Sequence, residues 1–182
     1  CRGINVDSAL DYIIGKSGES ASSVSGEDRG KLADLIVSKR KIFIYGSGRS
    51  GLVGQLFSVR LVQLGLDVHF VGEMTTPIMC KDDLLVLVSN TGETASVVKT
   101  ANIAGRIGSH VVCITADPNS KLAHASDTVI LLKTGKIKPE FAPLGTVFEL
   151  SALMFFDSFV ADMMEKLGCS EDDMRSRHAI WV

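Results

Sequence analysis

The sequence has few prolines, few aromatic residues and no long apolar run. Of 182 residues only 4 are Pro and 6% are aromatic, while 46% are hydrophobic and 22% are charged. This composition excludes a disordered, collagen-like or low-complexity chain. The longest uncharged apolar runs, such as 150–156, are far shorter than the roughly 20 residues of a membrane-spanning helix. We therefore expect a globular, soluble, cytoplasmic protein with no membrane partner.

An excess of charge of either sign is also missing. Lys and Arg total 19 against 21 Asp and Glu, a net charge of −2, and no segment concentrates cations as a nucleic-acid footprint requires. No nucleic-acid partner is expected. The cysteines are scattered without a CxxC pair, so neither a zinc site nor a disulfide framework is predicted. We expect free thiols at Cys1, Cys80, Cys113 and Cys169.

Apolar runs of about six residues, rich in β-branched side chains, recur along the middle of the chain. Most are apolar at nearly every position, as in strands buried on both faces of a parallel sheet. Segments with helical spacing separate them, at 51–64, 93–107 and 119–124, and such repeats imply right-handed crossovers. The expected fold is an α/β three-layer sandwich, flavodoxin-like or Rossmann-like, with a five-stranded parallel sheet flanked by helices. The predicted strands are 41–45, 67–71, 83–88, 110–115 and 127–132.

The two ends of the chain are predicted to be helical. Segments 7–14 and 27–39 precede the first strand, and 143–167 is the longest helical stretch. Ser170 and Asp173 resemble a capping box that opens a final short helix. Because no linker or repeat is visible, residues 1–182 are predicted to form a single domain. Its N-terminal helices cover about 7–39 and its C-terminal helices about 143–178.

A glycine-rich loop follows the first predicted strand. Residues 46–51 follow the GxGxxG pattern, and Glu73 lies 22 residues beyond Gly51, as in a dinucleotide fingerprint. Two serines and an arginine in the loop favour a sugar phosphate instead, because a pyrophosphate approached by backbone needs small side chains. A dinucleotide site and a ligand-free turn stay open as alternatives. The candidate binding residues are Ser47, Gly48, Arg49 and Ser50.

A second loop, rich in hydroxyls, follows the third predicted strand. It offers three hydroxyls within six residues, Gly92 permits its turn, and the next helix presents free N–H groups to a dianionic phosphate. A plain helix cap made by Thr91 with Thr94 is the alternative. If the first and third strands are neighbours, both loops lie on one rim, where open α/β sheets bind ligands. The candidates in this loop are Ser89, Asn90, Thr91 and Thr94.

Glu149 stands out as an acid on an otherwise apolar helix face. A carboxylate there is costly unless it meets a partner, a cleft or a bound ligand. It is therefore either a catalytic base or the member of an ion pair with an arginine such as Arg49 or Arg60. The four histidines show no metal-ligand spacing, so no metal is predicted, and the residues alone give His178 little functional weight.

Five segments together match a known family. They read YGSGRSGL at 45–52, VGEMTTP at 71–77, SNTGET at 89–94, APLGTVFE at 142–149 and SEDDMRSRHA at 170–179. They resemble the sugar isomerase (SIS) domain family and, within it, the 6-phospho-3-hexuloisomerases of the ribulose monophosphate pathway of formaldehyde fixation. The resemblance covers the chain from Lys31 onward. Asn90 departs from it, because Gly or Ser is commoner there.

The resemblance implies interconversion of D-arabino-hex-3-ulose 6-phosphate and fructose 6-phosphate through an enediolate, with no cofactor. It implies Glu149 as the base that removes the C2 proton and His178 as a second acid or base. The loop hydroxyls would hold the phosphate and the sugar. The family forms homotetramers, which implies sites at subunit interfaces and allows His178 to act in a neighbour's site. The implied pathway partner is 3-hexulose-6-phosphate synthase.

Three alternatives are weighed against this interpretation. Two keep the fold: an SIS isomerase of another sugar phosphate, and a non-catalytic module that senses a sugar phosphate. Sensing modules usually accompany a DNA-binding segment, which this sequence does not show, and would leave Glu149 without a purpose. The third is a dinucleotide-dependent oxidoreductase, which would leave the hydroxyl-rich second loop unexplained.

Overall fold

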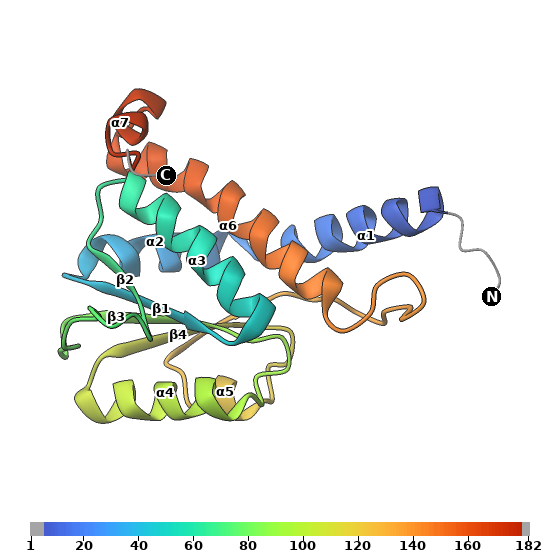
Figure 1. The fold of residues 1–182 in the computed structure, drawn as a ribbon, viewed down its shortest axis with the longest axis horizontal. Helices are drawn as coiled ribbons and strands as arrows, with labels where there is room; N and C mark the ends of the chain where they lie inside the picture. The colour runs from blue at the N-terminus through green and yellow to red at the C-terminus, as the bar shows by residue number, and fades with distance from the viewer. Residues whose placement is uncertain (1–5, 180–182) are drawn as a thin grey trace.

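Residues 6–179, the part of the chain that the computed structural model describes, form a three-layer α/β arrangement (Figure 1). Five strands, all parallel, make one sheet in the order β2-β1-β3-β4-β5. The predicted fold class and all five predicted strands are confirmed. The strands are β1 (Ile42–Gly46), β2 (Val68–Phe70), β3 (Leu84–Val88), β4 (His110–Thr115) and β5 (Thr128–Leu131).

Helices cover both faces of the sheet. In Figure 1, α4 and α5 lie on one face and α2, α3 and α6 on the other, with α1 along the first half of α6. The short α7 lies against α3 near the far end of α6. The helices are α1 (Val6–Ala21), α2 (Gly26–Ser38), α3 (Gly48–Gln63), α4 (Ala95–Ile107), α5 (Lys121–His124), α6 (Thr146–Leu167) and α7 (Glu171–Ser176).

The central strand β3 explains why the predicted strands are apolar at almost every position. All five of its residues are buried. Leu84, Val86 and Val88 belong to the core between the sheet and α3 and α6, whereas Leu85 and Leu87 belong to the core under α4. Successive side chains of a strand point to opposite faces, so a strand covered by helices on both sides needs apolar residues throughout.

The first helix is longer than the sequence predicts. Segment 7–14 was expected, but α1 continues to Ala21 through Gly15 and Gly18. These glycines lower helix propensity, which is why the prediction was wrong. Packing outweighs propensity here, because Gly18 faces Met154 of α6 and the buried Ser17 donates a hydrogen bond to the carbonyl of Val147, 3.4 Å away.

The other predicted helices begin and end within about three residues of the observed ones, the usual uncertainty of helix ends. The capping box of Ser170 and Asp173 is confirmed at the start of α7. Within residues 6–179, no helix is long and apolar enough to span a membrane, and no three metal-ligating side chains gather. The single domain over 1–182 and the cytoplasmic location stay predictions.

The cysteines of the described chain are free thiols, as expected, while Cys1 lies outside it. We predict that Cys113 resists alkylation by iodoacetamide at pH 8. Burial raises the pKa of the Cys113 thiol to about 11, so only about one thiol in a thousand is ionised at that pH. The exposed Cys80 should react, and timed labelling with peptide mass spectrometry compares the two. Cys113 should become reactive in urea; fast labelling in the folded protein would contradict the prediction.

Candidate active site

The two predicted loops start side by side on one rim of the sheet. Gly46 at the end of β1 pairs with Val88 at the end of β3, so the segments that follow leave the sheet at the same level. The strand order places β2 on one side of this pair and β4 and β5 on the other. Such a topological switch point is where open α/β sheets bind ligands. The expectation of a shared rim is confirmed.

The glycines of the first loop serve the packing of α3 over the end of β1. A Cβ on Gly51 would lie only 2.5 Å from the carbonyl oxygen of Gly46, and Gly48 has a φ of 58°. Helix α3 already begins at Gly48, three residues earlier than predicted. The close passage of backbone over backbone therefore explains Gly46 and Gly51 of the GxGxxG pattern, and the left-handed φ explains Gly48. It does not by itself indicate a dinucleotide.

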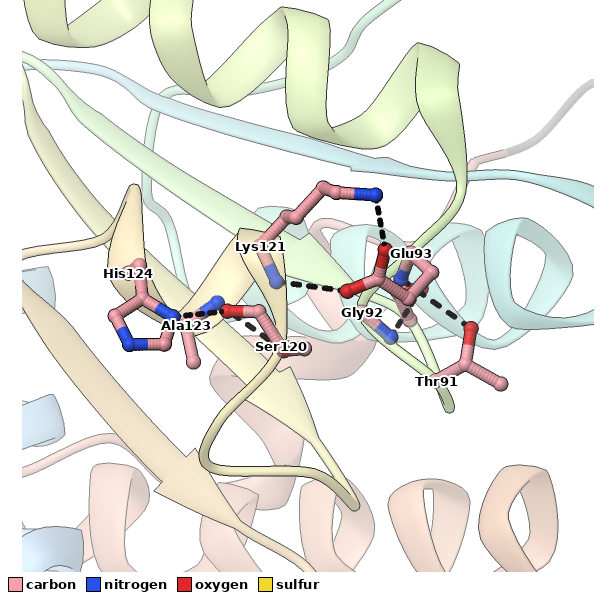
Figure 2. Close-up of polar contacts among 8 residues, drawn as sticks. Thr91, Gly92, Glu93, Ser120, Lys121, Ala123 and His124 are labelled. Atoms are coloured by element: carbon pink, nitrogen blue, oxygen red, sulfur yellow. Dashed lines mark hydrogen bonds and ion pairs between the residues drawn. The ribbon is translucent and has the colours of Figure 1, made fainter.

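The hydroxyls of the second loop do not form the plain helix cap of the alternative reading. Thr94 is the N-cap residue of α4, but its side chain makes no capping hydrogen bond. The hydroxyl of Thr91 instead accepts from the N–H of Glu93, 3.3 Å away (Figure 2), and the Oγ atoms of Ser89 and Thr94 lie 3.4 Å apart. The hydroxyls thus gather at the start of α4 without capping it, so the helix-cap explanation is wrong.

Segments from β4 and α5 pack behind the second loop. The carbonyl of Asn90 accepts from the N–H of Ala116 at 3.0 Å and from the hydroxyl of Thr115 at 3.1 Å. Gly92 has a φ of 62°, and any Cβ there would collide with the side chain of Ser120. The loop conformation is therefore set by its neighbours as well as by its own sequence.

Glu149 lies in the first turn of α6 and faces the first loop. The residue is only 7% exposed, and each carboxylate oxygen has a partner: Arg49 Nε donates to Oε2 at 3.0 Å, and Ser50 Oγ donates to Oε1 at 3.3 Å. An ion pair, one of the two alternatives for Glu149, is thus present and is made by Arg49. Arg60 was the wrong alternative, because it lies 3.6 Å from Asp157 instead.

Gly145 joins Glu149 to the second loop. Its φ is 96°, and a Cβ there would lie 2.9 Å from Asn90 Nδ2 and 3.4 and 3.5 Å from the Glu149 carboxylate oxygens. The amide of Asn90 and the carboxylate of Glu149 therefore converge on this glycine. Sequence reasoning did not count Gly145 among the site residues. The available signal was a glycine directly before the apolar helix.

His178 lies far from Glu149 within the same chain. It follows α7, beyond the end of α6, whereas Glu149 is in the first turn of α6 (Figure 1). From Glu149 to Leu167 alone, α6 extends about 27 Å at the rise of an α-helix. His178 is exposed and lines a cavity of about 520 Å³ with Arg60 and Asp157. One copy of the chain brings both loops to Glu149 but does not bring His178 there.

Comparison with known proteins identifies the fold family. Residues 35–163 match the model of the SIS domain. The chain belongs to the SIS domain family. A 3-hexulose-6-phosphate isomerase of Methanocaldococcus jannaschii is 42% identical over 147 residues, 81% of this chain and 80% of the relative. A protein of the same name from Bacillus subtilis is 34% identical over 174 residues, 92% and 94% of the two chains.

A solved structure of the same SIS fold agrees with this assignment. It is a Methanococcus jannaschii protein for which a 3-hexulose-6-phosphate isomerase function was inferred. It is 35% identical, has a TM-score of 0.87, and covers 95% of this chain with 98% of its own. The resemblance drawn from the five segments is confirmed, and the dinucleotide alternative is left without support.

Replacing Gly92 tests how the second loop is held. We predict that Gly92→Ala lowers stability by about 1–3 kcal/mol, because the left-handed backbone disfavours a side chain and Ser120 blocks it. The matched control is Gly105→Ala within α4, where nothing lies within 4 Å; it should stabilise by about 0.5–1 kcal/mol. Urea unfolding measures both. A Gly92→Ala protein as stable as the original would contradict the packing of this loop on Ser120.

Proposed function

We propose that this SIS domain protein is a sugar-phosphate isomerase that interconverts D-arabino-hex-3-ulose 6-phosphate and fructose 6-phosphate. The observation that carries the proposal is the buried Glu149 at the switch point of the sheet, which is bound by the first loop and lies across Gly145 from Asn90 of the second. Relatives that bear the name 3-hexulose-6-phosphate isomerase align over most of the chain and support this substrate.

The second loop provides the phosphate site. Ser89, Thr91 and Thr94 offer hydroxyls where α4 begins, and backbone N–H groups at a helix N-terminus attract a dianion. Ser47 is the exposed N-cap residue of α3 and, like Thr94, makes no capping bond with its side chain. With Gly48 beside it, Ser47 faces the same rim and serves the sugar hydroxyls.

Glu149 acts as the general base of the reaction. It takes the proton from C2 of the 3-ketose, the C–H electrons form a C2–C3 double bond, and O3 becomes an enediolate oxygen. A proton then returns to C3, O2 gives up its proton and O3 takes one up, which leaves the ketone at C2 and a hydroxyl group at C3. Arg49 contacts Glu149 through Nε, so its two terminal nitrogens are placed to stabilise the enediolate. No cofactor or metal is needed for these steps.

Ser50 and Asn90 support the base. Ser50 donates to Glu149 and so holds the carboxylate in place, and the Asn90 amide lies across Gly145 from the same carboxylate. Both were expected to bind substrate directly. In this proposal Asn90 keeps that role, whereas Ser50 acts through Glu149 until a substrate oxygen replaces the carboxylate as its acceptor.

His178 acts from a second copy of the chain. Helix α3 extends from Glu149 to the segment that carries His178. Arg49 in its first turn contacts Glu149. At its other end, the carbonyl of Gln63 accepts a hydrogen bond from Arg177, 3.2 Å away. His178 follows directly in sequence. A second α3 running antiparallel to the first would therefore bring one copy's His178 toward the other copy's Glu149.

The outer face of α3 suits such a contact. Four apolar side chains, spaced three or four residues apart, share one face of the helix, and two copies of one face pack together about a two-fold axis. A homotetramer then needs one further interface. These side chains are Leu52, Leu56, Val59 and Val62, exposed to 61%, 52%, 55% and 44%.

A coupled assay tests the proposal. With hexulose phosphate supplied by 3-hexulose-6-phosphate synthase, the protein should produce fructose 6-phosphate, and Glu149→Gln should lower kcat by about 10²-fold to 10⁴-fold. Arg49 is 65% exposed, so the substitution leaves no buried cation and should cost about 1 kcal/mol of stability or less. Normal turnover by Glu149→Gln would refute its role as the base. Turnover of a pentose phosphate instead would favour the alternative substrate class.

Mixing two inactive variants tests the origin of His178. Glu149→Gln and His178→Asn should each be inactive alone, and co-refolding them in equal amounts should restore about a quarter of the activity, because half of the dimers then carry one intact site out of two. Each variant refolded alone is the control. Mixed oligomers that form but show no activity would contradict a site shared between copies.

A further inference from the structure

Helix α5 is bound to the second loop through Glu93, the residue between Gly92 and Thr94. Figure 2 shows the carboxylate of Glu93 reaching the first residue of α5. The backbone N–H of Lys121 donates to Oε1 at 2.9 Å, and Lys121 Nζ donates to Oε2 at 2.7 Å. The N–H of Leu122 also donates to the carbonyl of Gly92, 3.0 Å away. Three bonds thus join this loop to α5.

This ion pair differs from the exposed pairs that lie within a single helix. Lys31 and Glu27, 2.6 Å apart, lie on consecutive turns of α2 and tie no separate segments together. Glu93 and Lys121 are 28 residues apart in sequence and join the second loop to α5. Hydrogen bonding to the Lys121 side chain and backbone holds the pKa of Glu93 below its usual range, and the Glu93 carboxylate raises the pKa of Lys121. The pair is ionised around neutral pH.

The position of Glu93 couples this contact to the candidate phosphate site. Its own N–H donates to the hydroxyl of Thr91, and the next residue, Thr94, is the N-cap residue of α4. Fixing the Glu93 side chain on α5 therefore fixes the backbone between two of the three loop hydroxyls. A loop held in its binding conformation loses less entropy when a ligand arrives.

We propose that Glu93 is a positioning residue, which through Lys121 holds loop 89–94 in the conformation that binds the phosphate of the substrate. The inference rests on the proposed function, since it takes this loop as the phosphate site. The Glu93 carboxylate points toward α5, where it is bound to Lys121, and takes no part in proton transfer. Its loss should weaken phosphate binding and leave the chemical step intact.

The test compares Glu93→Gln and Lys121→Met with the matched control Glu27→Gln. Glu93→Gln and Lys121→Met should each raise the Kd for fructose 6-phosphate and the KM for the hexulose phosphate by about threefold to tenfold, with kcat within about twofold of the original. The double variant should be no worse than the single ones, because both remove one interaction. Lys121→Arg keeps the charge and should bind fructose 6-phosphate about as tightly as the original protein. Glu27→Gln should leave this affinity unchanged. Calorimetry gives Kd and the coupled assay gives kcat and KM.

Several results would overturn the proposal. One is that the original protein binds and isomerises its substrate, and that Glu93→Gln and Lys121→Met bind fructose 6-phosphate with the same Kd as the original. Another is a fall in kcat and melting temperature with unchanged Kd, which would indicate a merely structural role; because the pair is exposed, we expect the melting temperature to move by no more than about 3 °C. If the original protein bound no sugar phosphate, the proposed function itself would fail, and this inference with it.

Discussion

The parallel pairing of β1 with β3 determines where every other part of the candidate site lies. Their ends are level at Gly46 and Val88, and each strand leads into a helix. Right-handed crossovers to β2 on one side and β4 on the other send α3 and α4 to opposite faces of the sheet. The N-termini of the two helices therefore meet at one point of the rim. A phosphate there would be attracted by both.

The acid reaches this rim because α6 is apolar. Phe156 of α6 stacks on Phe57 of α3 with ring centroids 4.1 Å apart, and Phe148, Phe155 and Phe159 are buried with it. This packing sets the first turn of α6 beside the first loop. The cost of burying the Glu149 carboxylate is offset by hydrogen bonds from the loop. The same contacts that pack the helix thus hold a charged group at the candidate site.

The fold could be predicted closely because its signals are local. Strands buried on both faces need unbroken apolar runs, and all five runs became strands. The end of α1 could not be predicted, because Gly15 and Gly18 disfavour a helix locally, and the packing of α1 on α6 that outweighs this preference is not visible in the sequence. The candidate site was predictable in its chemistry: the two loops and Glu149 were recognised. The geometry of the site was only partly predictable. Gly145 can be recognised as a site residue only from the structure, in which Asn90 and Glu149 lie on either side of it.

The sequence by itself determined the strands, the hydroxyls that follow them and the acid on an apolar face. Tertiary structure alone decided which charged groups meet: Arg49 rather than Arg60 on Glu149, Lys121 on Glu93, and His178 far from the acid with which the family resemblance grouped it. The physical reason is distance along the chain. The first two contacts join residues 100 and 28 positions apart, and local periodicity does not distinguish between two arginines that could each reach the same carboxylate.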